Sequence, residues 1–164
     1  MEIERKFTIK SLPENLSLYP CLHLEQGYLN TEPVIRIRKQ DEEYILTYKG
    51  SGMLVREEYN LPLTADSYAH LKQKCDGNII SKSRYIIPLE APEFTEECPK
   101  ELRPKHLTIE LDIFDAPFAP LVMAEVEFDS VEAAKAFIPP AWFSEDVTHN
   151  TEYHNSNLSS RVFP

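Results

Sequence analysis

Residues 1–7 read Met-Glu-Ile-Glu-Arg-Lys-Phe, and the rest of the chain repeats the pattern that they set. Glu2, Glu4 and Lys6 share one parity, and the residues between them fall on the other. Successive side chains of a β-strand point to opposite faces of a sheet. The opening stretch therefore predicts a strand over residues 2–9, one face of which carries two carboxylates and an ammonium group.

The same alternation recurs along the chain and predicts seven further strands. They are expected over residues 22–30, 34–39, 43–49, 54–61, 79–89, 107–114 and 121–128. Helical spacing replaces the alternation over residues 64–75 and again over residues 130–137. Because most neighbouring strands are joined by short connections, the pairing should be mainly antiparallel, in an α+β chain dominated by its sheet.

Charged residues collect on one parity of these strands. The basic members are Lys6, Arg36, Arg38, Lys49, Arg56, Lys82 and Arg84, and the acidic members are Glu2, Glu4, Glu58, Glu110, Asp112, Glu125 and Glu127. Seven cations and seven carboxylates sum to zero, so the remaining residues hold the whole net charge of −10. An ordinary solvated face would share that acidic excess. The retention of seven cations on one set of faces therefore indicates a site that uses them.

Two arrangements of these faces are compatible with the residues alone. An open sheet would put the charged face in bulk water and its helices on the apolar face. A closed barrel would enclose the charges in a water-filled lumen, and eight strands can close in this way. A lumen with a basic side and an acidic side suits a polyanion bridged to a divalent metal ion. No P-loop sequence is present, so phosphates would not be held by a glycine-rich backbone loop.

The motifs on these strands also form a family pattern. The Glu-x-Glu-x-Lys form of residues 2–6 is followed by Arg36-Ile37-Arg38, Thr47-Tyr48-Lys49-Gly50, Arg56-Glu57-Glu58, Lys82-Ser83-Arg84-Tyr85, Glu110-Leu111-Asp112, Ala124-Glu125-Val126-Glu127-Phe128, Val147-Thr148 and Tyr153-His154-Asn155. This series resembles the CYTH superfamily, also called triphosphate tunnel metalloenzymes, and the resemblance extends from residue 2 to about residue 158.

The resemblance implies one domain over residues 1–164, folded as a closed eight-stranded antiparallel barrel with a charged tunnel and helices packed outside. It further implies metal-dependent hydrolysis of a triphosphate, tripolyphosphate to pyrophosphate and phosphate, with Mg²⁺ or Mn²⁺ as the cofactor. Two alternatives remain open. One is an adenylate cyclase of the same fold, for which no adenine-specific pocket can be read, and the other is a non-catalytic polyphosphate-binding module.

The resemblance also assigns roles to the charged residues. Phosphate oxygens would be bound by Lys6, Arg36, Arg38, Lys49, Arg56, Lys82 and Arg84. The metal would be bound by Glu2, Glu4, Asp112, Glu125 and Glu127. Catalysis would involve Glu110 or Glu127, which would orient or deprotonate the attacking water, together with Lys82 and a tyrosine that pairs with it, matched by Tyr28. A place for Tyr28 in the core remains the alternative.

Three departures from the family pattern are specific to this sequence. Residues 91–106 form an apparent insertion with three prolines and no apolar period, which predicts an exposed, mobile loop that a two-residue turn can replace. Asn60 stands where many relatives carry an acidic residue. Asn150 and Glu152 replace residues that are commonly acidic and basic, which puts substrate and metal preference in doubt more than the fold.

Composition excludes several other classes of protein. No apolar run approaches 18 residues and no signal peptide is visible. Cys21, Cys75 and Cys98 are widely separated, which is typical of free thiols in a reducing cytoplasm. The net charge of −10 argues against a nucleic-acid or anionic-membrane surface. We therefore expect a cytoplasmic protein whose partner is a small-molecule triphosphate, and the sequence leaves a homodimer open.

Overall fold

A computed structural model describes residues 1–164. The strands are β1 (Glu2–Ile9), β2 (Cys21–Thr31), β3 (Val34–Gln40), β4 (Glu43–Lys49), β5 (Val55–Arg56), β6 (Glu58–Pro62), β7 (Asp76–Glu90), β8 (Glu93–Phe94), β9 (His106–Phe114), β10 (Val122–Glu127), β11 (Phe137–Ile138) and β12 (Phe143–Asp146). The α-helices are α1 (Ala65–Lys72), α2 (Val131–Ala136) and α3 (Asn155–Ser159), and 3-10 helices occupy Leu16–Leu18, Lys100–Leu102 and Thr151–Tyr153. None of these helices has the length and apolar character needed to cross a membrane.

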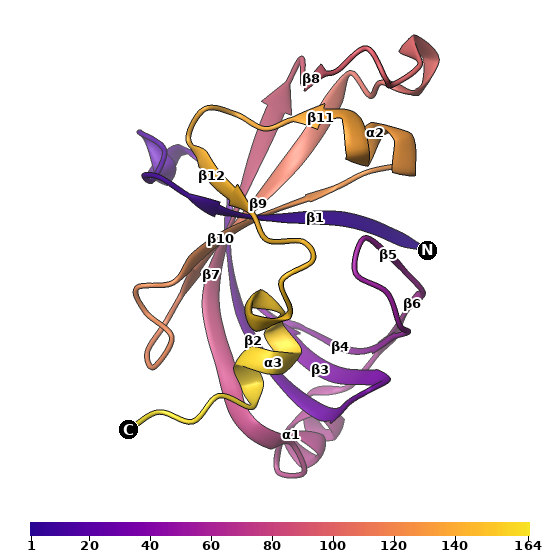
Figure 1. The fold of residues 1–164 in the computed structure, drawn as a ribbon. Coiled ribbons are helices and arrows are strands. Elements are labelled where there is room, and N and C mark those ends of the chain that lie inside the picture. The colour runs from indigo at the N-terminus through magenta and orange to yellow at the C-terminus, as the bar shows by residue number, and fades with distance from the viewer.

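The strands close into a barrel because β1 is paired on both of its sides. It pairs antiparallel with β10, where Glu4 lies opposite Glu127, and antiparallel with β5, where Glu2 lies opposite Arg56. The remaining order is β10-β9-β7-β2-β3-β4-β6, and β6 follows β5 along the chain. If β5 and β6 count as one broken strand, eight antiparallel strands surround the interior (Figure 1). The expected α+β barrel is confirmed.

Two parts of the wall differ from the sequence expectation. The strand expected over residues 54–61 is broken at Glu57, whose carbonyl accepts a hydrogen bond from the Gly50 N–H at 3.0 Å. The two halves therefore pair with different neighbours, β5 with β1 and β6 with β4. β12 lies beyond the last strand that the sequence predicts, and it pairs with β1 on the side that β10 leaves free, with Phe7 opposite Asp146.

The larger apolar core lies outside the barrel, over β1, β9 and β10. Phe7, Leu111 and Val126 point away from the lumen, as strand alternation requires, and they are at most 1 % exposed. Residues of α2, β11 and β12 cover them, and Phe137 and Phe143 both contact the ring of Phe7. Figure 1 shows α2 and β11 lying along the outside of β1. This layer fixes the face of the barrel from which most carboxylates project inward.

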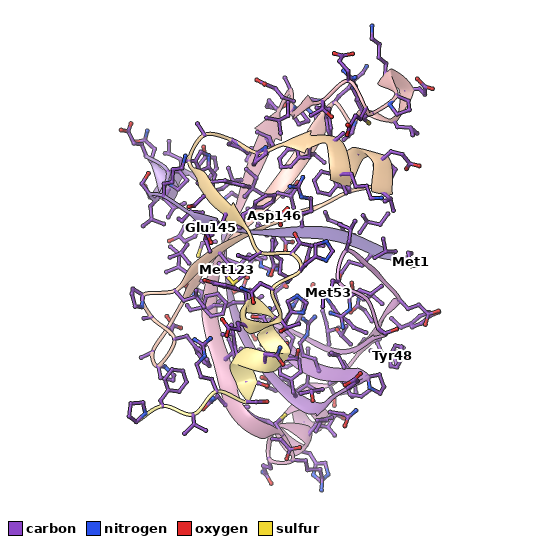
Figure 2. All side chains as sticks on the ribbon, viewed as in Figure 1. Met1, Tyr48, Met53, Met123, Glu145 and Asp146 are labelled. Carbon is purple, nitrogen blue, oxygen red and sulfur yellow. The ribbon has the colours of Figure 1, made fainter.

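A second apolar cluster closes one end of the barrel interior. Ile80, Phe114 and Met123 have the same inward orientation as the charged residues of their strands, but they lie further along the barrel, and Tyr28, which lies opposite Arg36, joins them. Leu158 of α3 packs against them and is 1 % exposed. Met123, labelled in Figure 2, belongs to this cluster. The charged part of the lumen is therefore closed on this side.

The helices begin where the sequence predicts. Thr64 caps α1, because its Oγ1 accepts a hydrogen bond from the Ser67 N–H at 3.1 Å. Ser130 caps α2 in the same way, accepting from the Ala133 N–H at 3.1 Å. α1 ends at Lys72, three residues before the expected end, and its Tyr68 packs on Tyr44 outside the β3–β4 pair.

The segment expected to be a free loop is partly built into the outer core. Most of residues 91–105 are exposed, but Cys98 is 1 % exposed within the larger core. β8 pairs with β11, with Phe94 opposite Phe137, and the Thr95 N–H donates to the Ala136 carbonyl at 2.9 Å. The absence of an apolar period did not reveal these contacts, because only two apolar side chains make them. A two-residue turn would remove both.

Phe94→Ala is therefore expected to lower the free energy of unfolding by about 1–3 kcal/mol, since it removes an aromatic ring that packs on Phe137. The measurement is urea unfolding at equilibrium. Leu102→Ala is the matched control, because Leu102 lies in the same segment and is 40 % exposed. Equal stability of the two variants would show that Phe94 does not contribute to the core and that the segment behaves as a free loop.

Candidate functional site

The barrel contains a cavity of 220 Å³ that no apolar residue lines. The lining residues are Glu2, Glu4, Lys6, Arg36, Arg38, Lys49, Glu58, Asn60, Arg84, Glu110, Glu125, Glu127 and Asn155. All but the last come from barrel strands, where alternation points them inward. Eleven of the fourteen charged residues collected from the sequence line this cavity, whereas Arg56, Lys82 and Asp112 do not, and neither does the candidate Tyr28.

Lys6 lies between two carboxylates on the acidic side of the cavity. Its Nζ is 2.8 Å from Glu4 Oε1 and 2.9 Å from Glu125 Oε1. Burial lowers the pKa of Lys6, but Glu125 and Glu4 outweigh that effect, so the pKa is raised above its ordinary value. Lys6 is therefore charged at neutral pH, and it neutralises part of the negative charge on this side.

Arg84 forms ion pairs with three carboxylates, more than any other cation of the cavity. Its Nε and Nη2 donate to the two oxygens of Asp112 at 2.6 and 2.7 Å, and Nη2 also donates to Glu125 Oε2 at 3.0 Å. Nη1 contacts Glu110. Burial raises the pKa of Asp112 and of Glu125, but the cations beside them outweigh it, so both pKa values lie below the usual range. Arg84 thus holds three carboxylates in place at once.

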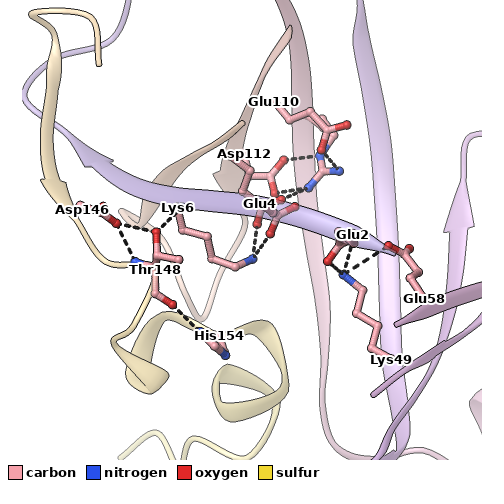
Figure 3. A network of polar contacts seen from close by, with 12 residues as sticks. Glu2, Glu4, Lys6, Lys49, Glu58, Glu110, Asp112, Asp146, Thr148 and His154 are labelled. Carbon is pink, nitrogen blue, oxygen red and sulfur yellow. Dashed lines mark hydrogen bonds and ion pairs between the residues drawn. The ribbon is translucent and has the colours of Figure 1, made fainter. Parts of the chain in front are cut away.

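Lys49 connects two carboxylates near the start of β1. Its Nζ donates to Glu2 at 2.9 and 3.0 Å and lies 4.0 Å from Glu58 Oε2 (Figure 3). Burial raises the pKa of Glu2, and a hydrogen bond shared with Glu58 raises it further, so the net shift is upward despite Lys49. Glu2 therefore takes up a proton more readily than a free carboxylate does, whereas burial of Glu58 is outweighed by the hydrogen bond with Glu2 and by Lys49, which lower the pKa of Glu58.

Arg36 and Arg38 are the cavity cations that have no carboxylate partner. Arg36 Nη2 donates only to Thr47 Oγ1, at 3.4 Å, and Nε of both residues is buried without a hydrogen bond. Burial, with Arg36 and Arg84 nearby, lowers the pKa of Arg38 to about 9. Two adjacent guanidinium groups with free donors are suited to bind an anion that carries several oxygens.

The carboxylates at the mouth of the cavity leave negative charge uncompensated. Glu127 lies directly opposite Glu4 and forms no ion pair. Burial raises the pKa of Glu127, and Glu2 and Glu4 raise it further. With Glu110 and Glu125, these two glutamates also line an adjoining pocket of 320 Å³. Crowded oxygen donors of like charge suit a hard divalent cation, although the acidic side chains do not converge on one point as they stand.

Four sequence candidates do not line the cavity. Lys82 is fully buried, with Nζ in an ion pair 2.6 Å from Asp112 Oδ2 and 5.1 Å from the centre of the Phe114 ring. Asp112 is 0 % exposed, both of its oxygens accept hydrogen bonds from Arg84, and it does not line the cavity. Lys82 contacts Asp112 and not Tyr28.

The other two candidates, Tyr28 and Arg56, are also absent from the lining of the charged cavity. Tyr28 belongs to the apolar cluster at the closed end, which is the core position that the sequence left open. The Arg56 guanidinium donates to the Gly50 carbonyl at 3.2 and 3.0 Å and lines a separate surface pocket. The break at Glu57 explains this position, because β5 does not continue into β6 as one straight strand.

Sequence reasoning missed three neutral residues of the interior. Asn60, noted only as a departure from the family pattern, accepts from Thr47 Oγ1 at 2.6 Å and donates to Glu58 at 3.3 Å. Asn155, noted only within a motif, lines the cavity. Gln26 is 0 % exposed and has no hydrogen bond at either side-chain atom. Gln26 lies on β2 opposite Arg38 of β3, and this position in the strand alternation was the signal that could have identified it as an interior residue.

The segment after β12 is fastened to β1 behind Lys6 (Figure 3). The Val147 N–H donates to the Lys6 carbonyl at 2.8 Å, and the Lys6 N–H donates to Thr148 Oγ1 at 3.0 Å. Asp146 accepts from both the N–H and the hydroxyl of Thr148. A ring nitrogen of His154 lies 3.1 Å from the Thr148 carbonyl. This polar network carries the chain from the outer edge of β1 to the cavity.

Comparison with known proteins agrees with this architecture. Residues 1–113 match the CYTH domain. Over 98 % of both chains, the sequence is 37 % identical to an inorganic triphosphatase of Nitrosomonas europaea. It is 29 % identical to an inorganic triphosphatase of Acetivibrio thermocellus, over 96 % of this chain and 92 % of that one. The crystal structure of the inorganic triphosphatase NE1496 superposes with a TM-score of 0.66 at 33 % identity, covering 99 % of this chain and 96 % of that chain. The chain therefore belongs to the CYTH domain family.

Proposed function

We propose that this protein is a metal-dependent triphosphatase that hydrolyses inorganic tripolyphosphate to pyrophosphate and phosphate. The observation that carries the proposal is the closed polar cavity, in which the unpaired Arg36 and Arg38 face the crowded Glu4 and Glu127. The relatives named inorganic triphosphatases, which align over nearly the whole chain, support the same activity. We also propose that residues 1–164 act as one domain.

In this proposal Arg36 and Arg38 bind the phosphate oxygens first, because neither has a carboxylate partner and the Nε of each is buried without a hydrogen bond. Lys6, Lys49 and Arg84 contribute further contacts, since the carboxylate oxygens that they bind resemble those of a phosphate group. Lys82 is assigned a supporting role. It contacts Asp112, which in turn holds the Arg84 guanidinium by two hydrogen bonds.

The residues that would hold the metal are Glu2, Glu4, Glu125 and Glu127, and Mg²⁺ or Mn²⁺ is the ion that their oxygen donors suit. The excess negative charge between Glu4 and Glu127 supports this assignment. When bound, such an ion neutralises phosphate charge and polarises the bond that breaks.

One carboxylate is proposed to receive the proton of the attacking water. Burial raises the pKa of Glu110 and of Glu127, which moves both carboxylates toward the range in which a general base operates. The water oxygen forms a bond to a terminal phosphorus, the P–O bond to the bridging oxygen breaks, and pyrophosphate leaves with the electron pair. Enclosure by the barrel restricts bulk water around the reacting groups.

An assay of the purified protein against several phosphate substrates tests the proposal. Tripolyphosphate, ATP, thiamine triphosphate and pyrophosphate are each supplied with Mg²⁺ or Mn²⁺, and phosphate release and cyclic AMP are measured. We expect phosphate release from tripolyphosphate, none from pyrophosphate, and loss of release when the metal is chelated. Cyclic AMP from ATP would instead indicate a cyclase, and binding without hydrolysis would indicate a polyphosphate-binding module. Cytoplasmic location is part of the proposal and is checked by cell fractionation.

A further inference from the structure

Asn155 is the one cavity residue that no barrel strand supplies, because it is the first residue of α3. Its Oδ1 is buried and has no hydrogen-bond partner. A buried polar atom without a partner is unfavourable, and such an atom at a ligand cavity indicates a partner that arrives with the ligand. The other carboxamide in the cavity, Asn60, is already bonded to Thr47 and Glu58.

The backbone around Asn155 is held at both ends. Upstream, His154 contacts the Thr148 carbonyl, and Thr148 is hydrogen-bonded to the Lys6 N–H on β1. Downstream, Leu158 is 1 % exposed in the apolar cluster at the closed end, and Asn78 on β7 donates to the Ser159 carbonyl at 3.1 Å. These anchors fix the start of α3 against the lumen. The orientation of the Asn155 side chain toward the cavity is therefore built into the fold.

We infer that Asn155 is a substrate-binding residue whose carboxamide NH₂ donates a hydrogen bond to a phosphate oxygen of the bound triphosphate. The inference rests on the proposed function and adds a residue to the same site. A half-turn about the last side-chain bond exchanges the amide oxygen and nitrogen, so the NH₂ group reaches the position that Oδ1 occupies. The charged donors of the cavity come from the strands, whereas Asn155 adds a neutral donor from α3. This donor leaves the balance of charge in the cavity unchanged.

The test compares Asn155→Ala and Asn155→Asp with the control Asn157→Ala. Asn157 lies on the same helix, is exposed, and donates to the Thr151 carbonyl, so its loss weakens the segment without touching the cavity. Tripolyphosphate binding is measured by calorimetry in EDTA, and KM and kcat are measured at saturating free Mg²⁺. Because a hydrogen bond to a charged group contributes about 1.5–3 kcal/mol, Asn155→Ala should raise Kd or KM by about tenfold or more.

Asn155→Asp tests whether the NH₂ donor or the oxygen acceptor of the carboxamide is needed for binding. A carboxylate keeps the shape and the acceptor but loses the donor and repels phosphate, so its Kd should exceed that of the alanine variant. Tripolyphosphate affinity equal to wild type in either Asn155 variant, or equal effects of Asn155→Ala and Asn157→Ala, would overturn the inference.

The proposed function and the role of Asn155 can fail separately. If the wild type binds tripolyphosphate without hydrolysing it and Asn155→Ala weakens binding, the proposed function fails and Asn155 keeps its role. If the wild type hydrolyses tripolyphosphate and Asn155→Ala leaves KM and Kd unchanged, the proposed function stands and Asn155 is not a substrate-binding residue.

Discussion

Arg84→Met is expected to lower the free energy of unfolding by about 3–5 kcal/mol at neutral pH and to abolish triphosphate hydrolysis, because it leaves several buried carboxylates without their cation. Methionine keeps most of the side-chain volume, so the effect reports the charge more than a cavity. Asp112, 0 % exposed, would retain only Lys82, and Glu125 would retain only Lys6. Urea unfolding and phosphate release measure the two effects.

The pH dependence of the stability loss in Arg84→Met distinguishes uncompensated charge from altered packing as its cause. In the wild type the pKa values of Asp112 and Glu125 are lowered on folding, so these groups stabilise the fold above their unfolded pKa values, and that stabilisation is lost as pH falls through the folded values. Without Arg84, burial raises both pKa values, and the penalty is relieved as pH falls and the carboxylates take up protons. The deficit of the variant should therefore shrink from neutral pH toward pH of about 4.

Arg103→Met serves as the control for this experiment. Arg103 bonds main-chain carbonyls, those of Cys98 and Thr95, but it holds no buried carboxylate. Its deficit should be small and constant with pH. An Arg84→Met deficit that is as large at low pH as at neutral pH would show that packing, and not the uncompensated charge, explains the loss.

Glu4→Gln and Arg38→Ala are expected to reduce kcat/KM by about 10²–10³-fold each, since each removes one charged contact to the reacting assembly. They should differ in what restores activity. Glu4→Gln removes a proposed metal ligand, so raising free metal should recover part of the rate. Arg38→Ala removes a guanidinium that has no partner in the barrel, so raising the substrate concentration should recover part of the rate.

The rescue experiment needs fixed free metal, because tripolyphosphate chelates divalent ions. Lys39→Ala is the control for Arg38→Ala, since Lys39 is the next residue on β3 and does not line the cavity. Glu57→Gln, the same substitution at an exposed glutamate between β5 and β6, is the control for Glu4→Gln. Full activity of Glu4→Gln at low metal would remove Glu4 from the proposed ligand set and leave the rest of the site intact.

Strand alternation made much of the site predictable, because parity determines which side chains face inward. It put Lys6, Arg36, Arg38 and Glu125 on one face of their strands, and in the closed barrel this face lines the cavity. Parity says nothing about depth along the barrel, however. Lys82 shares the parity of Arg84, yet it lies one step further in, where Phe114 and Asp112 separate it from the cavity.

Other features depended on contacts between distant segments. Closure of the barrel rests on the two-residue pairing of β5 with β1, which no local pattern reveals. The same pairing required a break at Glu57, and this break carried Arg56 out of the lumen. β12 is four residues long and shows no alternation of its own, so only its register on β1 identifies it as a strand. These elements were set by tertiary pairing and not by propensity.

The ion pairs that fill the lumen make substrate and metal thermodynamically dependent on each other. A phosphate oxygen that binds Lys6 or Arg84 must displace Glu125 or Glu110, and each displaced carboxylate then lacks a counter-ion in a buried site. A divalent ion supplies that counter-ion, so each ligand should bind more tightly when the other is present. Linkage requires the two enhancements to be equal. In the protein without ligands, Glu125 and Glu110 thus occupy the cations that the phosphate groups are proposed to bind. Their release would couple triphosphate binding to metal binding.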